Sequence, residues 1–197
     1  MSEEQVDLKR RRMLTAATVA VGAIGATTMV VPFGMSLLPS EKAKAAGAPV
    51  EVDISMIEDG QQVTVAWRGK PVWLVKRAAS VIEALPSLDD QLADPQSEVG
   101  QQPEYAKNEW RSINPDLSVL VGICTHLGCS PSYRPELAPA DLGAGWKGGY
   151  FCACHGSRFD LAGRVFKSVP APTNLVVPPH QYLTDTLVLV GEDGGAS

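Results

Sequence analysis

The strongest constraint on the fold of this chain is a stretch from Met13 to Ser40 that contains no charged residue. A helix of about 20 residues crosses the hydrocarbon core of a bilayer, and this stretch is longer than that. Pro32 lies near its far end, where a break in a membrane helix is tolerated. We therefore predict a transmembrane anchor over residues 13–38, with the lipid bilayer as a partner and a water-soluble head after it.

The charges on either side of this stretch predict its orientation. Four basic residues, Lys9 to Arg12, precede it, whereas only Lys42 and Lys44 closely follow it. The positive-inside rule then puts residues 1–12 in the cytoplasm and the rest of the chain outside. The run Arg11-Arg12-Met13-Leu14 is similar to a twin-arginine signal, which exports folded proteins from bacteria. We expect a single-pass protein of the bacterial inner membrane with its head in the periplasm.

The segment after the anchor, residues 39–49, is polar and built of small residues, which predicts a flexible tether. Its alanines are also compatible with a helix. Ala43, Ala45 and Ala46 suit a cleavage site, so a signal peptide is the alternative to a retained anchor. Signal peptides have shorter apolar regions than this one, which favours retention.

Residues 50–197 are predicted to form one mainly β domain. Short apolar or alternating runs, together with 18 Gly and 15 Pro, favour many short strands joined by turns. We expect strands at residues 50–54, 63–67, 72–75, 118–123 and 186–190, and one helix over 78–85 that ends at Pro86. This pattern predicts an antiparallel β sandwich. A net charge of -5 without a basic run in the head argues against binding of nucleic acid.

All four cysteines and two of the three histidines fall in two short segments. These segments read Cys124-Thr125-His126-Leu127-Gly128-Cys129 and Cys152-Ala153-Cys154-His155-Gly156-Ser157. Thiols and imidazoles are ligands for zinc and for iron–sulfur clusters, so the pattern predicts a metal site. Six candidate ligands exceed the four that one zinc ion or one [2Fe–2S] cluster takes, so one pair has another role. A disulfide is compatible with a head in an oxidising compartment.

These two motifs resemble those of one known family, the Rieske iron–sulfur subunits of cytochrome bc-type complexes, or ubiquinol–cytochrome c reductases. Flanking residues agree with the resemblance: Glu109-Trp110, Asp160 to Arg164, and the proline loop from Pro170 to Leu175. Members of that family also have an N-terminal anchor and a mobile tether. The resemblance implies a Rieske-type antiparallel β sandwich with a small cluster-binding subdomain at about residues 122–175.

The resemblance also implies the roles of the cysteines and histidines. One Rieske-type [2Fe–2S] cluster per subunit would be held by two cysteines on one iron and two histidines on the other, namely Cys124, His126, Cys152 and His155. The remaining cysteines, Cys129 and Cys154, would form a disulfide. Neutral imidazoles bring less negative charge than thiolates, so such a cluster accepts an electron more easily than one with four cysteines.

Three further roles follow from the same resemblance. His155 would hydrogen-bond the ubiquinol at the exposed tip, and Leu127 would belong to an apolar tip that docks on the partner. Ser157 would donate its hydroxyl to a sulfur of the cluster. The expected partners are a cytochrome b subunit, which carries most of the quinol pocket, and a membrane-anchored cytochrome c subunit. We expect a redox subunit that takes one electron from quinol, passes it to that cytochrome c, and is active only within a dimeric multisubunit complex.

The sequence departs from the family pattern in three places. Phe159 stands where most such subunits have a tyrosine that donates to a cysteine sulfur, so we expect a lower reduction potential. Val169 replaces a glycine before the proline loop. The segment 131–148 is longer than in compact members and is predicted to be a surface loop. The third histidine, His180, is predicted to be a surface-loop residue outside the site.

Three alternatives remain at this stage. Another periplasmic oxidoreductase, such as arsenite oxidase, has a small Rieske subunit with the same ligand pattern, but the proline loop, the uncut anchor and Glu109-Trp110 favour the quinol enzyme. A soluble Rieske ferredoxin would lack the anchor and the extra cysteine pair. A structural zinc module would have no redox role.

Overall fold

The structure is a computed structural model that describes residues 7–195. It divides into two compact units, residues up to 45 and residues from 46 onward. Residues 1–6 of the predicted N-terminal segment 1–12 lie outside the described residues, and so do residues 196–197 of the predicted head 50–197.

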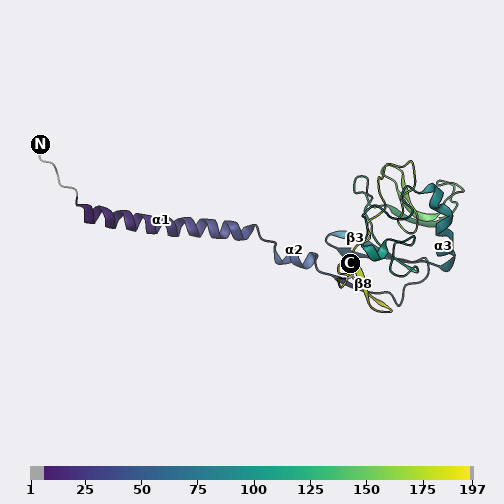
Figure 1. The fold of residues 1–197 in the computed structure, drawn as a ribbon, viewed down its shortest axis with the longest axis horizontal. Coiled ribbons are helices and arrows are strands. Elements are labelled where there is room, and N and C mark those ends of the chain that lie inside the picture. Colours follow the sequence, from purple (N-terminus) through teal and green to yellow (C-terminus); the bar gives the residue numbers. More distant parts are fainter. Residues whose placement is uncertain (1–6, 196–197) are drawn as a thin grey trace. The chain divides into compact units, whose positions relative to one another are not determined.

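The first unit consists mainly of the helix α1, Leu8–Ser36 (Figure 1). Asp7 caps this helix, because its carboxylate accepts hydrogen bonds from the backbone N–H groups of Lys9 (3.0 Å) and Arg10 (3.2 Å). Pro32 lies inside the helix without ending it. The helix is long and apolar enough to cross a membrane, as the sequence predicts for residues 13–38. It begins before that anchor, so the basic residues 9–12 belong to its first turns.

A second short helix, α2 (Glu41–Ala46), lies within the predicted tether. Ser40 stabilises its first turn by accepting a hydrogen bond from Ala43 N–H at its hydroxyl (3.2 Å). Lys44 and Glu41 form an exposed ion pair of 2.7 Å across one turn. The structure therefore contains the helix that the alanine-rich sequence allows, while the flexibility of residues 39–49 stays a prediction.

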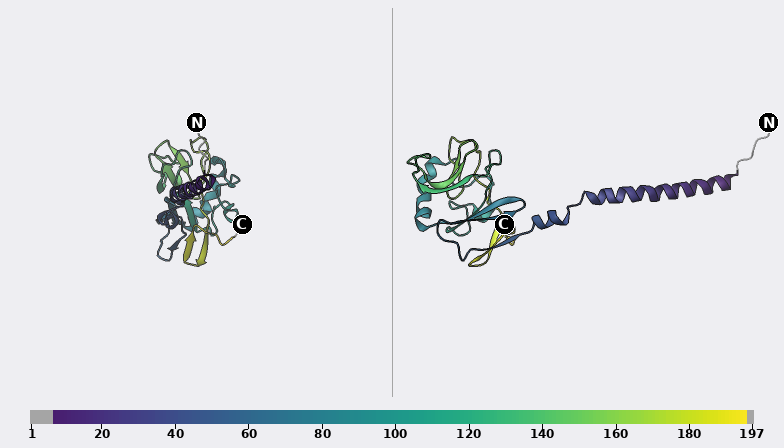
Figure 2. Two further views of the ribbon diagram at one scale, coloured as in Figure 1. Left: turned by 90° about the vertical axis from the view of Figure 1, so that its left-hand side faces the viewer. Right: turned by 180° about the vertical axis from the view of Figure 1, so that it is seen from behind.

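The head contains three sheets of three strands each within the described residues, and every pair of neighbouring strands is antiparallel. The first sheet has the order β1 (Val50–Asp53), β9 (Leu187–Val190), β8 (His180–Thr184). The second has the order β2 (Gln62–Trp67), β3 (Lys70–Lys76), β4 (Leu117–Val121). The third has the order β5 (Ser132–Leu137), β6 (Lys147–Cys152), β7 (Ser157–Phe159). The green β5–β7 sheet and the yellow β8–β9 hairpin lie at opposite ends of the head (Figures 1 and 2).

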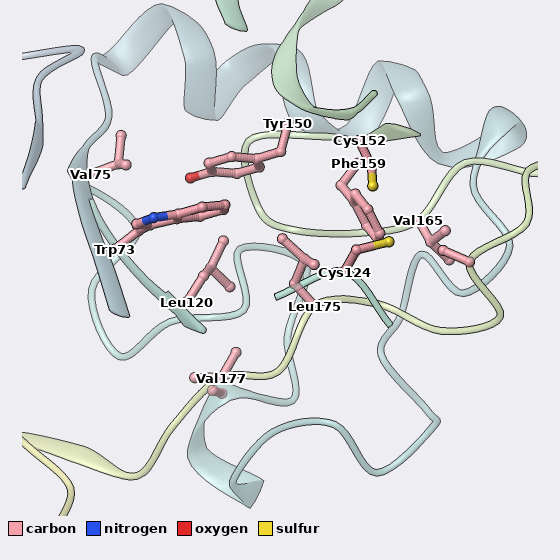
Figure 3. Close-up of a cluster of buried hydrophobic side chains, with 12 residues drawn as sticks. Trp73, Val75, Leu120, Cys124, Tyr150, Cys152, Phe159, Val165, Leu175 and Val177 are labelled. Carbon is pink, nitrogen blue, oxygen red and sulfur yellow. The ribbon is translucent and has the colours of Figure 1, made fainter. Parts of the chain in front are cut away.

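The second sheet, β2–β3–β4, explains why the chain forms a sandwich. Neighbouring residues of β3 point to opposite faces, and both faces are buried: Val72 and Leu74 pack into one apolar cluster, whereas Trp73 and Val75 pack into another. β4 is likewise buried along its whole length. The second cluster contains Cys124 and Cys152 (Figure 3) and therefore places the two cysteine segments against the core. The predicted antiparallel β architecture is confirmed.

Local sequence determines several of these elements. The hairpin β2–β3 turns at Arg68 and Gly69, which both have positive φ (50° and 72°), as a two-residue turn of this kind requires. The helix α3 (Ala79–Ala84) agrees with the expected helix, but Pro86 does not end the helical segment. It lies in the first turn of a 3-10 helix, Leu85–Gln91, where a backbone N–H is not needed. A second 3-10 helix covers Glu104–Ala106.

Two sequence predictions are wrong. The segment 131–148 is not simply a surface loop, because it contains β5 and the turn into β6, and its residues Leu142 and Trp146 are buried. His180 is not a surface-loop residue: it begins β8 and is 1% exposed. Its Nδ1 lies 2.8 Å from the carbonyl of Pro178, and its backbone N–H donates to the hydroxyl of Tyr105 (2.8 Å). A partner from a distant segment, Tyr105, therefore helps to make His180 a structural core residue.

Candidate metal centre

Two loops of the head fold into the same kind of turn. In the first loop, which follows β4, Gly128 donates its N–H to the carbonyl of Cys124 (3.1 Å). In the second loop, between β6 and β7, Gly156 donates its N–H to the carbonyl of Cys152 (2.8 Å). Both glycines have positive φ (85° and 77°), a conformation that a side chain would strain. Each loop therefore keeps one cysteine at its base and carries a histidine on the turn.

A disulfide between Cys129 and Cys154 joins the two loops, with Cα atoms 6.7 Å apart. This confirms the pairing that the family resemblance implies. Cys129 also accepts a backbone hydrogen bond from Cys124 (2.7 Å), so the disulfide is tied to the base of the first loop. For a sequence separation of 25 residues, chain entropy makes such a bond worth about 3–4 kcal/mol. The disulfide therefore fixes the two loops to each other.

The other two cysteines, Cys124 and Cys152, are free thiols, and each is 2% exposed. Burial raises the pKa of the Cys124 thiol, while hydrogen bonds from the His126 backbone and the Ser157 hydroxyl oppose that shift. The neighbouring Cys152 thiol raises the pKa of the Cys124 thiol further. Figure 3 shows both sulfur atoms at one side of the apolar cluster, near the ring of Phe159. Two candidate sulfur ligands are thus placed together on the inner side of the loops.

The two loop histidines lie next to each other. The ring centroids of His126 and His155 are 4.7 Å apart, and the rings are nearly perpendicular, at 84°. His126 is half-buried and His155 is exposed. Leu127, which follows His126 in the first loop, is 72% exposed. The structure therefore brings the predicted ligands into one small region, with the thiols inside and the imidazoles toward solvent.

The donor set fits a [2Fe–2S] cluster with two sulfur and two nitrogen ligands. Soft thiolates and imidazoles suit iron–sulfur chemistry, and four protein ligands complete such a cluster. A different grouping, Cys129, Cys152 and Cys154, has its sulfur atoms within 4.8 Å of one another. Two of those sulfurs are bonded in the disulfide and have no thiolate to offer, so this grouping is not a three-thiolate site. The free thiols and the histidines are the available ligands.

Two buried residues of β7 lie beside the cysteine sulfurs. Ser157 is fully buried; its Oγ accepts a hydrogen bond from Ala171 N–H (3.1 Å), and its hydroxyl is free to donate to Cys124. Phe159 is also fully buried and has no group that could donate. Of the two hydroxyl donors that the family pattern provides, this chain therefore carries the serine alone.

The proline loop, residues 170–175, packs against both cysteine loops. Ala171 contacts Ser157 of the second loop, and the carbonyl of Thr173 accepts a hydrogen bond from the Thr125 hydroxyl of the first loop (2.7 Å). Val169, which replaces the usual glycine, packs partly buried against the same apolar cluster as the cysteines. The substitution is therefore accommodated by packing.

A buried ion pair lies in the segment between β7 and the proline loop, and the sequence did not assign it a role. Arg164 Nε lies 2.7 Å from Asp160 Oδ2, and both side chains are fully buried. Arg164 also pairs with Asp89 (2.8 Å) of the 3-10 helix. Opposite charges four residues apart around Gly163 are the sequence signal that could have suggested this pair. The ion pair ties the segment after β7 to the 85–91 helix.

Comparison with known families gives two matches. The family described as "Ubiquitinol-cytochrome C reductase Fe-S subunit TAT signal" matches residues 1–40. The family described as "Rieske [2Fe-2S] domain" matches residues 89–180, which include both cysteine loops and the proline loop.

Individual relatives match almost the whole chain. The ubiquinol-cytochrome c reductase iron-sulfur subunit of Allochromatium vinosum is 61% identical over 197 residues, which cover 100% of this chain and 95% of the relative. The subunit of the same name from Rhodospirillum rubrum is 41% identical over 183 residues, which cover 92% of this chain and 91% of the relative. A solved structure named "Hyperthermophilic respiratory Complex III" is 28% identical, has a TM-score of 0.47, and covers 89% of this chain and 98% of its own.

Proposed function

Since this chain belongs to the family of ubiquinol–cytochrome c reductase iron–sulfur subunits, we propose that its two cysteine loops form the quinol-facing redox tip of that enzyme. The chain is an electron-transfer subunit of ubiquinol–cytochrome c reductase, and its cofactor is a Rieske [2Fe–2S] cluster. Its partners are the cytochrome b and cytochrome c1 subunits of that complex. The curated relatives carry the name of this enzyme or of the cytochrome b-c1 complex, and the arsenite oxidase alternative has no support among them.

Four residues are proposed to hold the cluster: Cys124 and Cys152 on one iron, and His126 and His155 on the other. The observation that carries this assignment is the pairing of two free, buried thiols with two adjacent imidazoles on loops that a disulfide joins. When bound, the cluster supplies a one-electron acceptor and donor. Burial of the thiols keeps water from the sulfur ligands, while the outer position of the imidazoles leaves them accessible to a substrate.

His155 is proposed to bind the ubiquinol. It is the exposed member of the histidine pair, so a quinol hydroxyl can reach its ring without displacing protein atoms. If one ring nitrogen of His155 held the iron, the other could accept the hydrogen bond and then the proton of the hydroxyl once it had lost its own proton, which the positive charge of the iron favours. Leu127 places an apolar side chain, 72% exposed, on the neighbouring loop. We assign Leu127 to the surface that docks on the apolar mouth of the quinol pocket in cytochrome b.

The N-terminal unit is proposed to anchor the subunit in the bacterial inner membrane as a single span. The chain is a membrane-anchored subunit with a twin-arginine signal at its N-terminus. The charge asymmetry around α1 supports residues 1–12 in the cytoplasm and the head in the periplasm. Residues 39–49 then serve as the tether that lets the head move between cytochrome b and the cytochrome c subunit of a dimeric complex.

The ligand assignment is tested by substitution in membranes that contain the whole complex. His155→Gln is expected to abolish the electron paramagnetic resonance signal of the reduced cluster and the reduction of cytochrome c by quinol. The matched control is His180→Gln, which removes an imidazole outside the site and is expected to keep both. Retention of the full signal in His155→Gln would contradict the assignment.

The docking role is tested by Leu127→Ala. We expect the resonance signal to remain while quinol oxidation slows, and the spectral change caused by a quinol-site inhibitor to weaken. Leu137→Ala is the matched control, because Leu137 is similarly exposed (75%) but lies on β5. An equal effect of the two substitutions would show that the apolar contact at Leu127 is not specific.

A further inference from the structure

The interior of the head has an excess of positive charge, although the whole chain has a net charge of -5. Among the described residues that are buried, three side chains carry a guanidinium group and only one carries a carboxylate: Arg77, Arg111, Arg164 and Asp160. Burial of a charge is unfavourable unless other groups compensate it, so these residues need an explanation.

One of the three guanidinium groups is neutralised. Arg164 pairs with Asp160 (2.7 Å) and with Asp89 (2.8 Å). Arg77 and Arg111 form no ion pair with any carboxylate in residues 7–195. The interior therefore retains two positive charges that lack a directly bound counter-charge.

Backbone and side-chain oxygens hold these two guanidinium groups. Arg111 donates to the carbonyl of Leu175 (2.6 Å) and to Gln102 Oε1 (2.9 Å). Arg77 donates to the carbonyl of Trp110 (2.8 Å) and to the hydroxyl of Ser112. These neutral acceptors take hydrogen bonds from the terminal nitrogens, but the Nε of each arginine is buried without a partner, and the charge remains. Burial lowers the pKa of each arginine to about 10, so both remain protonated at neutral pH.

Acidic side chains compensate these charges only in part. Asp160 is buried near both arginines but is already bound to Arg164. Asp116, near Arg77, is exposed, and Asp94, near Arg111, is half-buried. The Asp94 carboxylate is itself occupied by the backbone N–H groups of residues 98 and 99. Water and salt screen such partly exposed charges more than they screen buried ones.

Both arginines border the apolar cluster that contains the thiols of Cys124 and Cys152. Arg111 binds the backbone of Leu175, whose side chain belongs to this cluster and lies beside Cys124 in Figure 3. Arg77 follows Val75, another member of the cluster, by two residues in the chain. Apolar side chains thus separate each guanidinium from the sulfur ligands, and a charge acts more strongly through such a medium than through water.

We infer that the buried charges of Arg77 and Arg111 raise the reduction potential of the cluster. This inference rests on the proposed ligand set. Reduction adds one electron, and therefore one negative charge, to the cluster. A fixed positive charge in the surrounding interior stabilises that reduced state relative to the oxidised state. The two arginines would thus offset part of the loss caused by Phe159, which supplies no hydroxyl donor.

The test is a redox titration of the membrane-bound complex, followed by the resonance signal of the reduced cluster. Arg111→Met removes the charge, whereas Arg111→Lys keeps it, and both lose the guanidinium hydrogen bonds. We expect the midpoint potential to fall in Arg111→Met and to stay near the wild-type value in Arg111→Lys, while both variants lose stability. Equal potentials in the two variants would overturn the inference.

Further variants keep the test decisive if Arg111→Met does not fold. The pair Arg77→Met and Arg77→Lys is expected to show the same contrast. Arg134→Met removes a charge from an ion-paired residue of β5 near the surface and is expected to leave the potential unchanged. In the wild type, the midpoint potential is expected to change little between low and high salt, and a strong salt dependence would count against control by buried charges.

These measurements separate the inference from the proposed ligand set. The amplitude of the resonance signal reports whether a cluster is bound, and the midpoint potential reports how the interior tunes it. A full signal with an unchanged potential in Arg111→Met would refute the arginine effect alone. Absence of a Rieske-type signal in the wild type would refute the ligand set.

Discussion

Removal of one hydroxyl, by Ser157→Ala, is expected to lower the reduction potential of the cluster without loss of the cluster. The buried Ser157 hydroxyl lies near Cys124, a proposed iron ligand, and lowers the pKa of its thiol, as a donor to that sulfur would. A hydrogen bond to a charged acceptor contributes about 1.5–3 kcal/mol, and we attribute roughly 1–2 kcal/mol of that to the more negative reduced state. For a one-electron couple this corresponds to a fall of about 40–80 mV.

The same substitution also affects stability, because it leaves the backbone N–H of Ala171 without its acceptor (3.1 Å). A buried donor without a partner costs about 1–3 kcal/mol. Redox titration of the resonance signal measures the potential, and iron analysis shows whether the cluster is retained. Thr125→Val is the control, since its hydroxyl donates to the carbonyl of Thr173 (2.7 Å) rather than to sulfur. An unchanged potential in Ser157→Ala, or an equal fall in Thr125→Val, would refute this reasoning.

Three other changes have defined outcomes. Phe159→Tyr is expected to raise the midpoint potential by on the order of 50 mV, because it adds a hydroxyl donor near the cysteine sulfurs; redox titration checks this, and no rise would contradict it. Joint replacement of Cys129 and Cys154 by alanine is expected to lower the free energy of unfolding by about 3.5 kcal/mol. Denaturant titration of the full chain in detergent measures this change, and a loss below about 1 kcal/mol would contradict the structural role of the disulfide. Burial lowers the pKa of His180 from 6.5, so below pH 6.5 the unfolded chain binds a proton that the folded head does not, and stability falls as the pH decreases. His180→Gln should flatten this dependence in denaturant titrations between pH 7.5 and pH 5.5, and an unchanged slope would show that His180 does not cause it.

Local sequence patterns were sufficient to predict the strands β3 and β4 and the turn before β3. The apolar runs of β3 and β4 are buried on both faces, and such strands have continuous rather than alternating apolar residues. The turn at Arg68 and Gly69 was also predictable, because turn residues separate two apolar runs there. The anchor and the two cysteine segments were equally local signals.

Elements that depend on distant partners were not predictable. Gly149 interrupts the apolar pattern of β6, yet it is required there because the carbonyl of Phe159 lies where a side chain would project. His180 is buried by Tyr105, which is 75 residues away in the sequence. The charges of Arg77 and Arg111 suggested nothing about burial, since the carbonyls that hold Arg111 come from remote segments.

The candidate site was likewise predictable only in the features that depend on local sequence. The residue types and spacing predicted a metal site from the sequence alone. Four cysteines allow three disulfide pairings, so the bond between Cys129 and Cys154 followed from the family resemblance and not from the spacing. The inner position of the thiols and the outer position of the imidazoles become visible only in the folded loops.

The most direct test of the account is pulsed electron paramagnetic resonance on the reduced, membrane-bound protein, combined with iron analysis. We expect two irons per chain and couplings to the ring nitrogens of two histidines, which disappear with His126→Gln or His155→Gln and persist with His180→Gln. A cluster without nitrogen ligands, or zinc in place of iron, would contradict it.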